Sequence, residues 1–411
     1  MTKLEELIAK LCPDGVEYKT LTELFDTKNG YTPSKSKEEY WTNGTVPWFR
    51  MEDIRENGGI LSKAIQYVSE SAIKGSLFPA DSIIVATSAT IGQHALIKVP
   101  SLANQRFTYL VLKDEFKEQI DIMFIYYCCF KLDEYCKECL NQGNFASVDM
   151  KKFLKFKFPV PPLEVQREIV RILDNFTFLS AELAAELAAR QKQYEYYKEY
   201  LFENHISDVE WKRLDELFPF IRNGFVGTIK SFFTNEIDGI RYLEGTNIHD
   251  GVISDNEILY VTKEFHEKHI KNQLKADDIL MVQSGHIGEC AVVGKKYEGA
   301  NCHALIIMSN GGECLSKYYV YYFHTLKGFK SLTPAITGGT IKHVLAGKVG
   351  KIKVPVPPLE VQQRIVDILD RFDTLCNDIS NGLPAEIKLL KKQYEYFRDK
   401  LLTFKELKKE A

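Results

Sequence analysis

Apolar residues spaced alternately by three and four positions form one long series in the middle of the chain. The series is Ile169, Leu173, Phe176, Ser180, Leu183, Leu187, Arg190, Tyr194, Tyr197 and Leu201, with polar interruptions at Ser180 and Arg190. This spacing predicts a heptad seam on a helix from about Leu163 to Glu203, roughly 60 Å long at the usual rise per residue. A compact domain rarely needs so long a helix, so we expect it to act as a spacer.

A second series with the same spacing lies near the C-terminus. It begins with Ile365, Leu369, Phe372, Cys376 and Ile379 and resumes with Ile387, Leu390, Tyr394, Phe397, Leu401 and Phe404. The intervening Asn381-Gly382-Leu383-Pro384 is expected to interrupt this helix. Two seams of similar length in one chain favour an antiparallel coiled coil. A short amphipathic helix, KLEELIAKL, opens the chain, and we expect it to pack with the C-terminal helix.

The chain contains one stretch twice: PVPPLEVQREIVRILDNF at 159–176 and PVPPLEVQQRIVDILDRF at 355–372, offset by 196 residues. Other pairs flank it: GVEYKTLTELF with DVEWKRLDELF, DSIIVATSATIG with DDILMVQSGHIG, and the helix-like MFIYYCCFKLDEYC with YYVYYFHTLKGF. QYEYYKEYL and QYEYFRDKL match at an offset of 200, so the second copy carries four additional residues there. The chain is therefore an internal duplication, which must be recognised before any fold is assigned.

The repeats predict an α+β protein built from two similar mixed α/β domains with pseudo-two-fold symmetry. We divide the chain into an N-terminal helix (1–14), a first domain (15–158), a central helical region (159–206), a second domain (207–354) and a C-terminal helical region (355–411). The two helical regions are expected to join the domains.

Composition narrows the class of protein. The chain has 411 residues, 45% of them hydrophobic, and contains no apolar run that is long enough to span a bilayer. Nine scattered cysteines, including adjacent Cys128 and Cys129, favour free thiols and the cytoplasm. A net charge of −3 argues against indiscriminate coating by nucleic acid, although one face can still bind DNA.

No catalytic constellation is found in the sequence. There is no phosphate-binding loop, no DPPY- or NPPY-type tetrapeptide and no glycine-rich cofactor fingerprint. His266-Glu267-Lys268-His269 misses the HExxH spacing, and we expect a solvated turn there. Cys136 and Cys139 invite a zinc site, but no second ligand pair follows, so buried thiols on a helix are the better interpretation. We therefore expect no catalytic residue, no metal and no cofactor.

The order of these motifs resembles a known family. A globular domain, PxPPLxxQxxIVxxLD, a heptad helix ending in QYEYY, and a second copy of each are similar to the DNA-specificity (S) subunit of type I restriction–modification systems. SAEL-AAEL at 180–187 is similar to the tetrapeptide repeat of that family's central region. The second helical region departs from this pattern, because it has no such tetrapeptides and carries the Gly382/Pro384 interruption.

The resemblance implies a non-catalytic subunit whose two target recognition domains read a bipartite site in double-stranded DNA. It also implies docking of two methyltransferase (M) subunits and of restriction/translocase (R) subunits, with no membrane partner. The docking residues it suggests belong to the repeated motif and the heptad helices: Pro161, Pro162, Leu163, Gln166, Tyr194, Tyr196, Pro357, Pro358, Leu359, Gln362, Tyr394 and Tyr396. Each added tetrapeptide would lengthen the central helix by roughly 6 Å, close to two base-pair steps.

Candidate DNA-contacting residues lie near expected strand ends and turns, where loops can reach a groove. They are Arg50, Arg55, Lys63, Ser88, Gln105 and Arg106 in the first domain, and Arg222, Lys230, Arg241, Asn247, Gln283, Ser284, His286 and Lys342 in the second. An ordinary surface or structural role remains the competing interpretation for each residue. For the whole chain, the alternatives are the specificity chain of a system whose partner fuses methylase and nuclease, a coiled-coil scaffold, and an enzyme with an unrecognised site.

Overall fold

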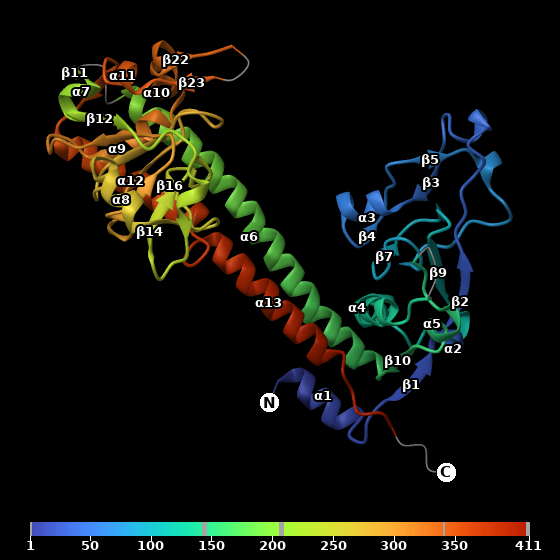
Figure 1. Cartoon of the computed structure of the whole chain (residues 1–411). Coiled ribbons are helices and arrows are strands. Elements are labelled where there is room, and N and C mark those ends of the chain that lie inside the picture. Colours follow the sequence, from blue (N-terminus) through green and yellow to red (C-terminus); the bar gives the residue numbers. More distant parts are fainter. Residues whose placement is uncertain (1, 142–145, 205–208, 340–341, 408–411) are drawn as a thin grey trace. The chain divides into compact units, whose positions relative to one another are not determined.

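The structure, a computed structural model, describes residues 2–141, 146–204, 209–339 and 342–407. It separates into two compact units, residues 1–182 with 387–411 and residues 183–386. Each unit holds one α/β domain and part of the helical regions (Figure 1). The domain boundary expected at 206/207 lies outside the described residues.

The first domain is built on a five-stranded sheet in the order β2-β9-β6-β7-β4. All neighbours in it are antiparallel except β4 and β7. The strands are β2 (Phe25–Asn29), β4 (Ile60–Leu61), β6 (Ser82–Ala86), β7 (His94–Ile97) and β9 (Phe107–Leu112). A smaller sheet contains β3 (Val46–Phe49), β5 (Tyr67–Val68) and β8 (Leu102–Ala103). The run SIIVA is wholly buried because β6 lies inside the main sheet, which confirms the strand expected there.

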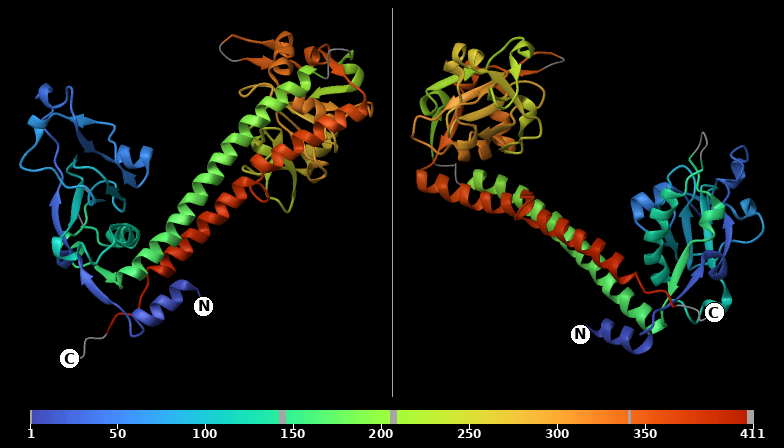
Figure 2. Two further views of the ribbon diagram at one scale, coloured as in Figure 1. Left: turned by 180° about the vertical axis from the view of Figure 1, so that it is seen from behind. Right: turned by 60° about the horizontal axis from the view of Figure 1, so that its bottom comes forward.

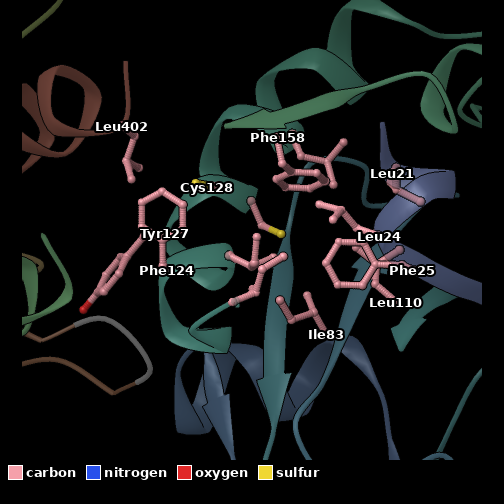
Figure 3. Packing of buried hydrophobic residues seen from close by; sticks show 14 of the residues in the cluster. Leu21, Leu24, Phe25, Ile83, Leu110, Phe124, Tyr127, Cys128, Phe158 and Leu402 are labelled. Atoms are coloured by element: carbon pink, nitrogen blue, oxygen red, sulfur yellow. The ribbon is translucent and has the colours of Figure 1, made fainter. Parts of the chain in front are cut away.

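Helix α4 (Ile122–Glu138) covers one side of this sheet. Asp121 caps it by accepting a hydrogen bond from the backbone N–H of Met123 at 2.9 Å. Figure 3 shows Phe124 and Cys128 of α4 in the same buried cluster as Phe158, with Ile83 and Leu110 contributed by the sheet. Cys129 and Cys136, also on α4, are buried, so the sequence interpretation of these thiols as core residues is confirmed. The other α-helices of this domain are α2 (Leu21–Leu24), α3 (Met51–Asn57) and α5 (Met150–Phe153).

The second domain repeats this plan with a four-stranded antiparallel sheet in the order β12-β21-β18-β19. Its strands are β12 (Phe220–Asn223), β18 (Ile279–Val282), β19 (Cys290–Val292) and β21 (Leu305–Ser309). A second sheet contains β13 (Phe233–Thr234), β14 (Gly239–Leu243), β17 (Leu259–Thr262) and β20 (Asn301–Cys302). Two short antiparallel pairs accompany these sheets: β15 (Ile248–His249) with β16 (Val252–Ile253), and β22 (Ile336–Thr337) with β23 (His343–Val344).

The helices of the second domain show where its sequence differs from the first. The counterpart of α4 is split into α9 (Ser316–Phe323) and α10 (Leu326–Ser331), because Thr325 caps a new helix through the backbone N–H of Gly328. The other helices are α7 (Leu214–Leu217), α8 (Lys263–Lys268) and α11 (Ala346–Val349). The solvated turn expected at 266–269 is wrong. Residues 266–268 belong to helix α8, whose Phe265 is buried. The ring of His266 forms a hydrogen bond with Asn301 at 2.7 Å.

Each domain closes with the same two-stranded pairing. In the first, β1 (Glu17–Thr20) is antiparallel to β10 (Lys157–Val160). In the second, β11 (Glu210–Arg213) is antiparallel to β24 (Lys353–Val356). The last strand of each pair runs directly into the repeated PPLEVQ motif, so the beginning and the end of each domain meet where the helical region starts.

The central helix α6 (Leu163–Asn204) is a single helix of 42 residues, which confirms the expected span (Figure 2). In the first unit its Phe176 stacks on Phe397 of α13 (Leu383–Leu401), with ring centroids 5.7 Å apart. In the second unit its Tyr194 stacks on Phe372 of α12 (Leu359–Asn377) at 6.1 Å. From Phe176 to Tyr194 of α6 the residue numbers rise, whereas those of their stacking partners fall from Phe397 to Phe372. The helical regions therefore form an antiparallel coiled coil.

The interruption of the C-terminal helical region is confirmed, but it begins earlier than the seam predicted. Helix α12 ends at Asn377, where Asp378 Oδ1 accepts hydrogen bonds from the backbone N–H groups of Ser380 and Asn381 at 2.7 and 3.2 Å. Ile379 therefore lies outside the helix and is 73% exposed, so its assignment to the seam is wrong. A Cβ at Gly382 would come within 2.3 Å of the Thr374 carbonyl oxygen, which explains the glycine.

The opening helix α1 (Lys3–Leu11) packs within the first unit. Its Leu4 is buried in the same cluster as Leu402, which follows α13. Lys3 pairs with Glu168 of α6 at 2.9 Å, and Arg171 holds the same carboxylate at 2.7 Å. Among the described residues, no helix is both long and apolar enough to cross a membrane.

Candidate nucleic-acid interface

In each domain, one buried glutamine of the repeated motif attaches the domain to its helix. Gln166 accepts a hydrogen bond from the backbone N–H of Asp121 at 2.9 Å and donates to the carbonyls of Gln119 and Pro161 at 2.9 and 2.7 Å. Gln362 accepts from the backbone N–H of Leu315 at 2.9 Å and donates to the Pro357 carbonyl at 2.8 Å. Both side chains are fully buried in their own chain, where they clamp the domain to the helix, and their role in docking a partner stays a prediction.

A tyrosine and an aspartate reinforce each clamp about two turns farther along the helix. Tyr127 donates to Asp174 at 2.5 Å in the first unit, and Tyr321 donates to Asp370 at 2.6 Å in the second. Burial raises the pKa of both phenols well above the usual range, so each remains a donor at neutral pH. The domains are thus held on their helices by equivalent bonds.

The other suggested docking residues divide by exposure. Pro161 and Pro357 are buried, Pro162 and Leu163 are half-buried, and Tyr194 and Tyr394 lie in the helix seams. Pro358 and Leu359 are exposed, and so are Tyr196 and Tyr396, at 63% and 61%. Tyr196 also stacks on Tyr200, with ring centroids 5.8 Å apart. These exposed residues are the ones that a partner chain can reach.

The Ser- and Gly-containing turn that follows the central strand occupies the same place in both domains. An isolated antiparallel β-bridge joins the backbone of Ser88 to that of Ser147. The equivalent β-bridge in the second domain joins Ser284 to His343, and both residues are offset by 196 positions. The bridging segments also pair through Val148 N–H to Thr87 O and Val344 N–H to Gln283 O, both at 2.9 Å. In the first domain Ala89 takes a left-handed conformation, φ 65°, where the second domain has Gly285, φ 82°. A non-glycine residue there is strained and marks a turn held by its surroundings.

In the first domain, predicted residues from separate segments gather around one cavity of about 870 Å³. Arg50 precedes α3, while Gln105 and Arg106 lie between β8 and β9, and all three line it. The Arg106 carbonyl accepts from the backbone N–H of Thr87, which places this loop beside the Ser88 turn. Arg55 and Lys63 are exposed but do not line the cavity.

Several residues of this cavity were not predicted from the sequence. Trp41 and Trp48 line it in an edge-to-face arrangement with centroids 5.0 Å apart, together with Lys35, Gln66 and Asn104. Two tryptophans within eight positions of a polar segment were the signal that could have revealed them. Three cationic side chains and two carboxylates, Glu38 and Glu52, face the cavity, so it combines positive charge, amides and aromatic faces.

Three predicted residues of the second domain are already engaged within it. Arg222 donates to Ser309 Oγ at 2.8 Å and to the Gln273 carbonyl at 3.1 Å. Arg241 donates to the carbonyls of Tyr242 and Leu259 at 2.7 and 3.1 Å and contacts Asp255. Asn247 is buried and holds its own turn through Glu244, Ser254 and Glu257. These groups support the fold, and DNA contact by them stays a prediction.

The remaining predicted residues of the second domain are accessible. Gln283 is half-buried, while Ser284 and His286 are exposed on the matched turn, and Lys342 is exposed beside it. His249 lies near His286, with ring centroids 6.1 Å apart. Lys230 is also exposed, in a separate short helical segment. The turn and the neighbouring segment at 342–343 thus form an accessible polar surface of this domain.

The described residues include no group of three His, Cys, Asp or Glu side chains arranged to hold a metal ion. Burial raises the pKa of the Cys136 thiol to about 12, so it stays protonated and is a poor metal ligand at neutral pH. The cavity and the matched turns are therefore surfaces suited to binding by hydrogen bonds, charge and stacking.

Comparison with known proteins gives a consistent result. The family model described as type I restriction modification DNA specificity domain matches residues 13–189 and again residues 206–389. The type I restriction enzyme EcoprrI specificity subunit of Escherichia coli is 39% identical over 395 residues, covering 89% of this chain and 90% of that protein. The EcoR124I/EcoR124II specificity subunit of Escherichia coli is 34% identical, covering 64% of this chain and 68% of that protein.

Two solved structures share the fold. One, from work on complex assembly and conformational transition of the type I R-M system, has a TM-score of 0.66 at 19% identity and covers 96% of this chain and 98% of its own. The HsdS subunit from Thermoanaerobacter tengcongensis has a TM-score of 0.58 at 17% identity and covers 96% and 97%. With two family domains and a relative matched over nearly its whole length, the chain belongs to the type I restriction–modification DNA specificity family.

Proposed function

We propose that this chain is the non-catalytic DNA-recognition subunit of a type I restriction–modification complex and that it acts in the cytoplasm. Each α/β domain contacts one half of a bipartite site in double-stranded DNA. The helical regions set the length of the unread spacer between the half-sites. One observation carries the proposal: the two domains share their clamps and turns but expose different side chains, as two readers of different base sequences require.

Contact with DNA would occur at the accessible polar surfaces. In the first domain these are the cavity with Arg50, Gln105 and Arg106 and the Ser88 turn. In the second they are Gln283, Ser284, His286 and Lys342, and Lys230 is exposed in a separate segment. Arginine and amide side chains suit base edges, while serine, lysine and backbone N–H groups suit phosphate.

The partners in this proposal are two methyltransferase subunits and restriction/translocase subunits. They would dock on the exposed positions of the helical regions, Tyr196 and Tyr396 among them. Exposed tyrosines supply large contact areas at low entropic cost and are enriched at protein interfaces. A partner that fuses methylase and nuclease is the alternative, and the mass of the protein that co-purifies with this chain decides between them.

Methylation sequencing tests the recognition role. Cells that contain the partner subunits are compared with and without this chain, and one bipartite methylated motif is expected to disappear when the chain is removed. If every methylated motif persists, the chain does not direct the methyltransferase. Exchanging residues 15–158 for the same domain of a relative should change one half-site and leave the other unchanged.

A further inference from the structure

The two domains place chemically opposite side chains, Arg50 and Glu244, at one structural position. In the first domain β3 runs parallel to β8, with Trp48 opposite Leu102. In the second domain β14 runs parallel to β20, with Tyr242 opposite Asn301. Arg50 and Glu244 each follow their strand at the same distance, two residues beyond Trp48 and Tyr242.

The backbone after both strands makes the same turn. The N–H of Arg50 donates to Asp53 Oδ2 at 2.7 Å, and the N–H of Glu244 donates to Asn247 Oδ1 at 2.8 Å. Asp53 and Asn247 are both buried, so each turn is held from inside by a side chain three residues later. Since the main chain supplies this bond, the side chains of residues 50 and 244 are not needed for it.

The neighbouring loop is matched as well. Asn104 N–H donates to the carbonyl of Phe49 at 3.0 Å, and His303 N–H donates to the carbonyl of Leu243 at 2.8 Å. The loop then differs in length, because Gln105 and Arg106 have only Ala304 as their counterpart before the next strand begins. The scaffold around the position is thus conserved between the domains, while its polar side chains are replaced.

The Arg50 side chain is held in place but keeps its donors available. Its guanidinium carbon lies 5.8 Å from the centre of the Trp48 ring, and its nearest carboxylate is Glu52 at 3.9 Å. Nε is buried without a hydrogen-bond partner among the described residues, while the side chain as a whole is 30% exposed and lines the cavity. An arginine stacked on an aromatic ring is pre-organised for bidentate recognition.

Glu244 offers the complementary chemistry. It is half-buried, and it makes no ion pair within the part of the chain that the structure describes. A carboxylate has only acceptors, whereas a guanidinium has only donors. In the major groove, arginine donates to O6 and N7 of guanine, and glutamate accepts from the exocyclic amino group of cytosine.

We propose that Arg50 reads a guanine in the first half-site and that Glu244, at the equivalent position of the second domain, accepts a hydrogen bond from a cytosine amino group in the second half-site. This inference rests on the proposed recognition function. It adds that one position of the duplicated fold determines a base pair in each half-site, with opposite hydrogen-bonding polarity.

The test uses the full complex with its methyltransferase partner on the cognate duplex and on duplexes that each carry one changed base pair. For the wild-type complex, each changed pair in a half-site is expected to weaken binding by roughly 5- to 150-fold. R50A should reduce the discrimination at one guanine of the first half-site to within about 2-fold and leave the second half-site unchanged. E244Q should do the same at one cytosine of the second half-site.

Two further variants separate a base contact from a phosphate contact or a loss of folding. R50K keeps the positive charge but loses the bidentate geometry, so it should resemble R50A if Arg50 reads a base and the wild type if Arg50 neutralises a phosphate. K117A removes an exposed cation of the same domain that does not line the cavity, and it should leave discrimination at every base pair unchanged.

The inference is overturned if R50A weakens all duplexes equally, if R50K retains full discrimination, or if E244Q leaves the second half-site unchanged. In each of those cases the wild-type complex still selects its bipartite site, so the recognition function stands. If the wild-type complex shows no preference among the duplexes, the recognition function itself fails.

Discussion

The two helical regions descend from one repeated stretch, yet they have different structures. The first is the unbroken helix α6, whereas the second is divided into α12 and α13 by the turn at Asp378. The α/β domains differ from the helical regions in this respect, because they keep the same structure but carry different side chains on their surfaces. Their clamps at Gln166 and Gln362 are alike, while the side chains at positions such as Arg50 and Glu244 differ in charge. Residues that attach a domain to its helix are therefore retained in both copies, and divergence is concentrated on accessible surfaces and in the helix that sets length.

The largest effect is expected from lengthening only the unbroken helix. Inserting one AAEL unit after Leu187 extends α6 by roughly 6 Å, close to two base-pair steps. The methylated motif should then carry a longer unread spacer with both half-sites unchanged, as determined by methylation sequencing. As the matched control, four residues inserted after Ser380 enlarge the turn between α12 and α13 and should leave the spacer as it is. Altered half-sites with an unaltered spacer would refute the role of α6 as a spacer.

The clamps should differ in strength because Gln166 makes three hydrogen bonds and Gln362 makes two. Q166A leaves buried backbone groups unpaired and should destabilise the first domain by about 2–4 kcal/mol, against about 1–3 kcal/mol for Q362A in the second. Hydrogen exchange of the amides of Asp121 and Leu315 measures the two effects separately. Q363A, which removes an exposed glutamine beside the second clamp, is the control and should change stability by less than about 0.5 kcal/mol. Equal losses of stability in Q166A and Q362A would contradict the prediction that the first clamp is stronger.

The tyrosine–aspartate hydrogen bonds also allow the two domains to be compared, with smaller expected changes in the free energy of unfolding. Y127F removes the hydrogen bond to the exposed carboxylate of Asp174 and should cost about 1 kcal/mol, because water can replace part of it. Y321F should cost less, since Lys317 continues to pair with Asp370 at 2.8 Å. Denaturant unfolding followed by hydrogen exchange ranks the two variants. A larger loss for Y321F would show that Lys317 does not compensate.

The smallest effect concerns acid stability of the first unit alone. Hydrogen bonds from Arg171, followed by Lys3, lower the pKa of Glu168 to about 2, and the second copy has Arg364 at this position. A carboxyl whose folded pKa is lowered stabilises the fold above its unfolded pKa of about 4.3, and this contribution is lost as the pH falls toward 2. Because Lys3 and Arg171 are exposed, we expect only about 0.5 kcal/mol. In E168Q, the loss of protection of α1 amides between pH 5 and 2 should be smaller than in the wild type, and the remainder is assigned to Glu5, whose pKa is lowered by its hydrogen bonds with Thr2. An unchanged acid dependence would exclude Glu168 as a source.

The long helix and the duplication were predictable because they depend on local spacing and on sequence identity within the chain. The heptad series placed α6 to within a residue, and the Gly382/Pro384 interruption appeared where backbone chemistry requires it. Ile379 was misplaced because the helix ends at an aspartate that captures two backbone N–H groups, and a heptad pattern does not register such a turn.

The candidate interface was less predictable for a physical reason. Arg50 and Arg222 are both arginines close to a strand end, so residue type and position in the sequence do not distinguish them. Whether a guanidinium is available depends on what lies around it. The Nη atoms of Arg222 donate to Ser309 and to the Gln273 carbonyl, whereas the guanidinium of Arg50 lies over the Trp48 ring and lines the cavity. Sequence by itself determined the duplication, the helical seams and the family, because these are encoded in spacing and identity along the chain. Only the tertiary structure decided which polar groups are free to bind and which hold the fold together, because their partners come from segments far apart in sequence.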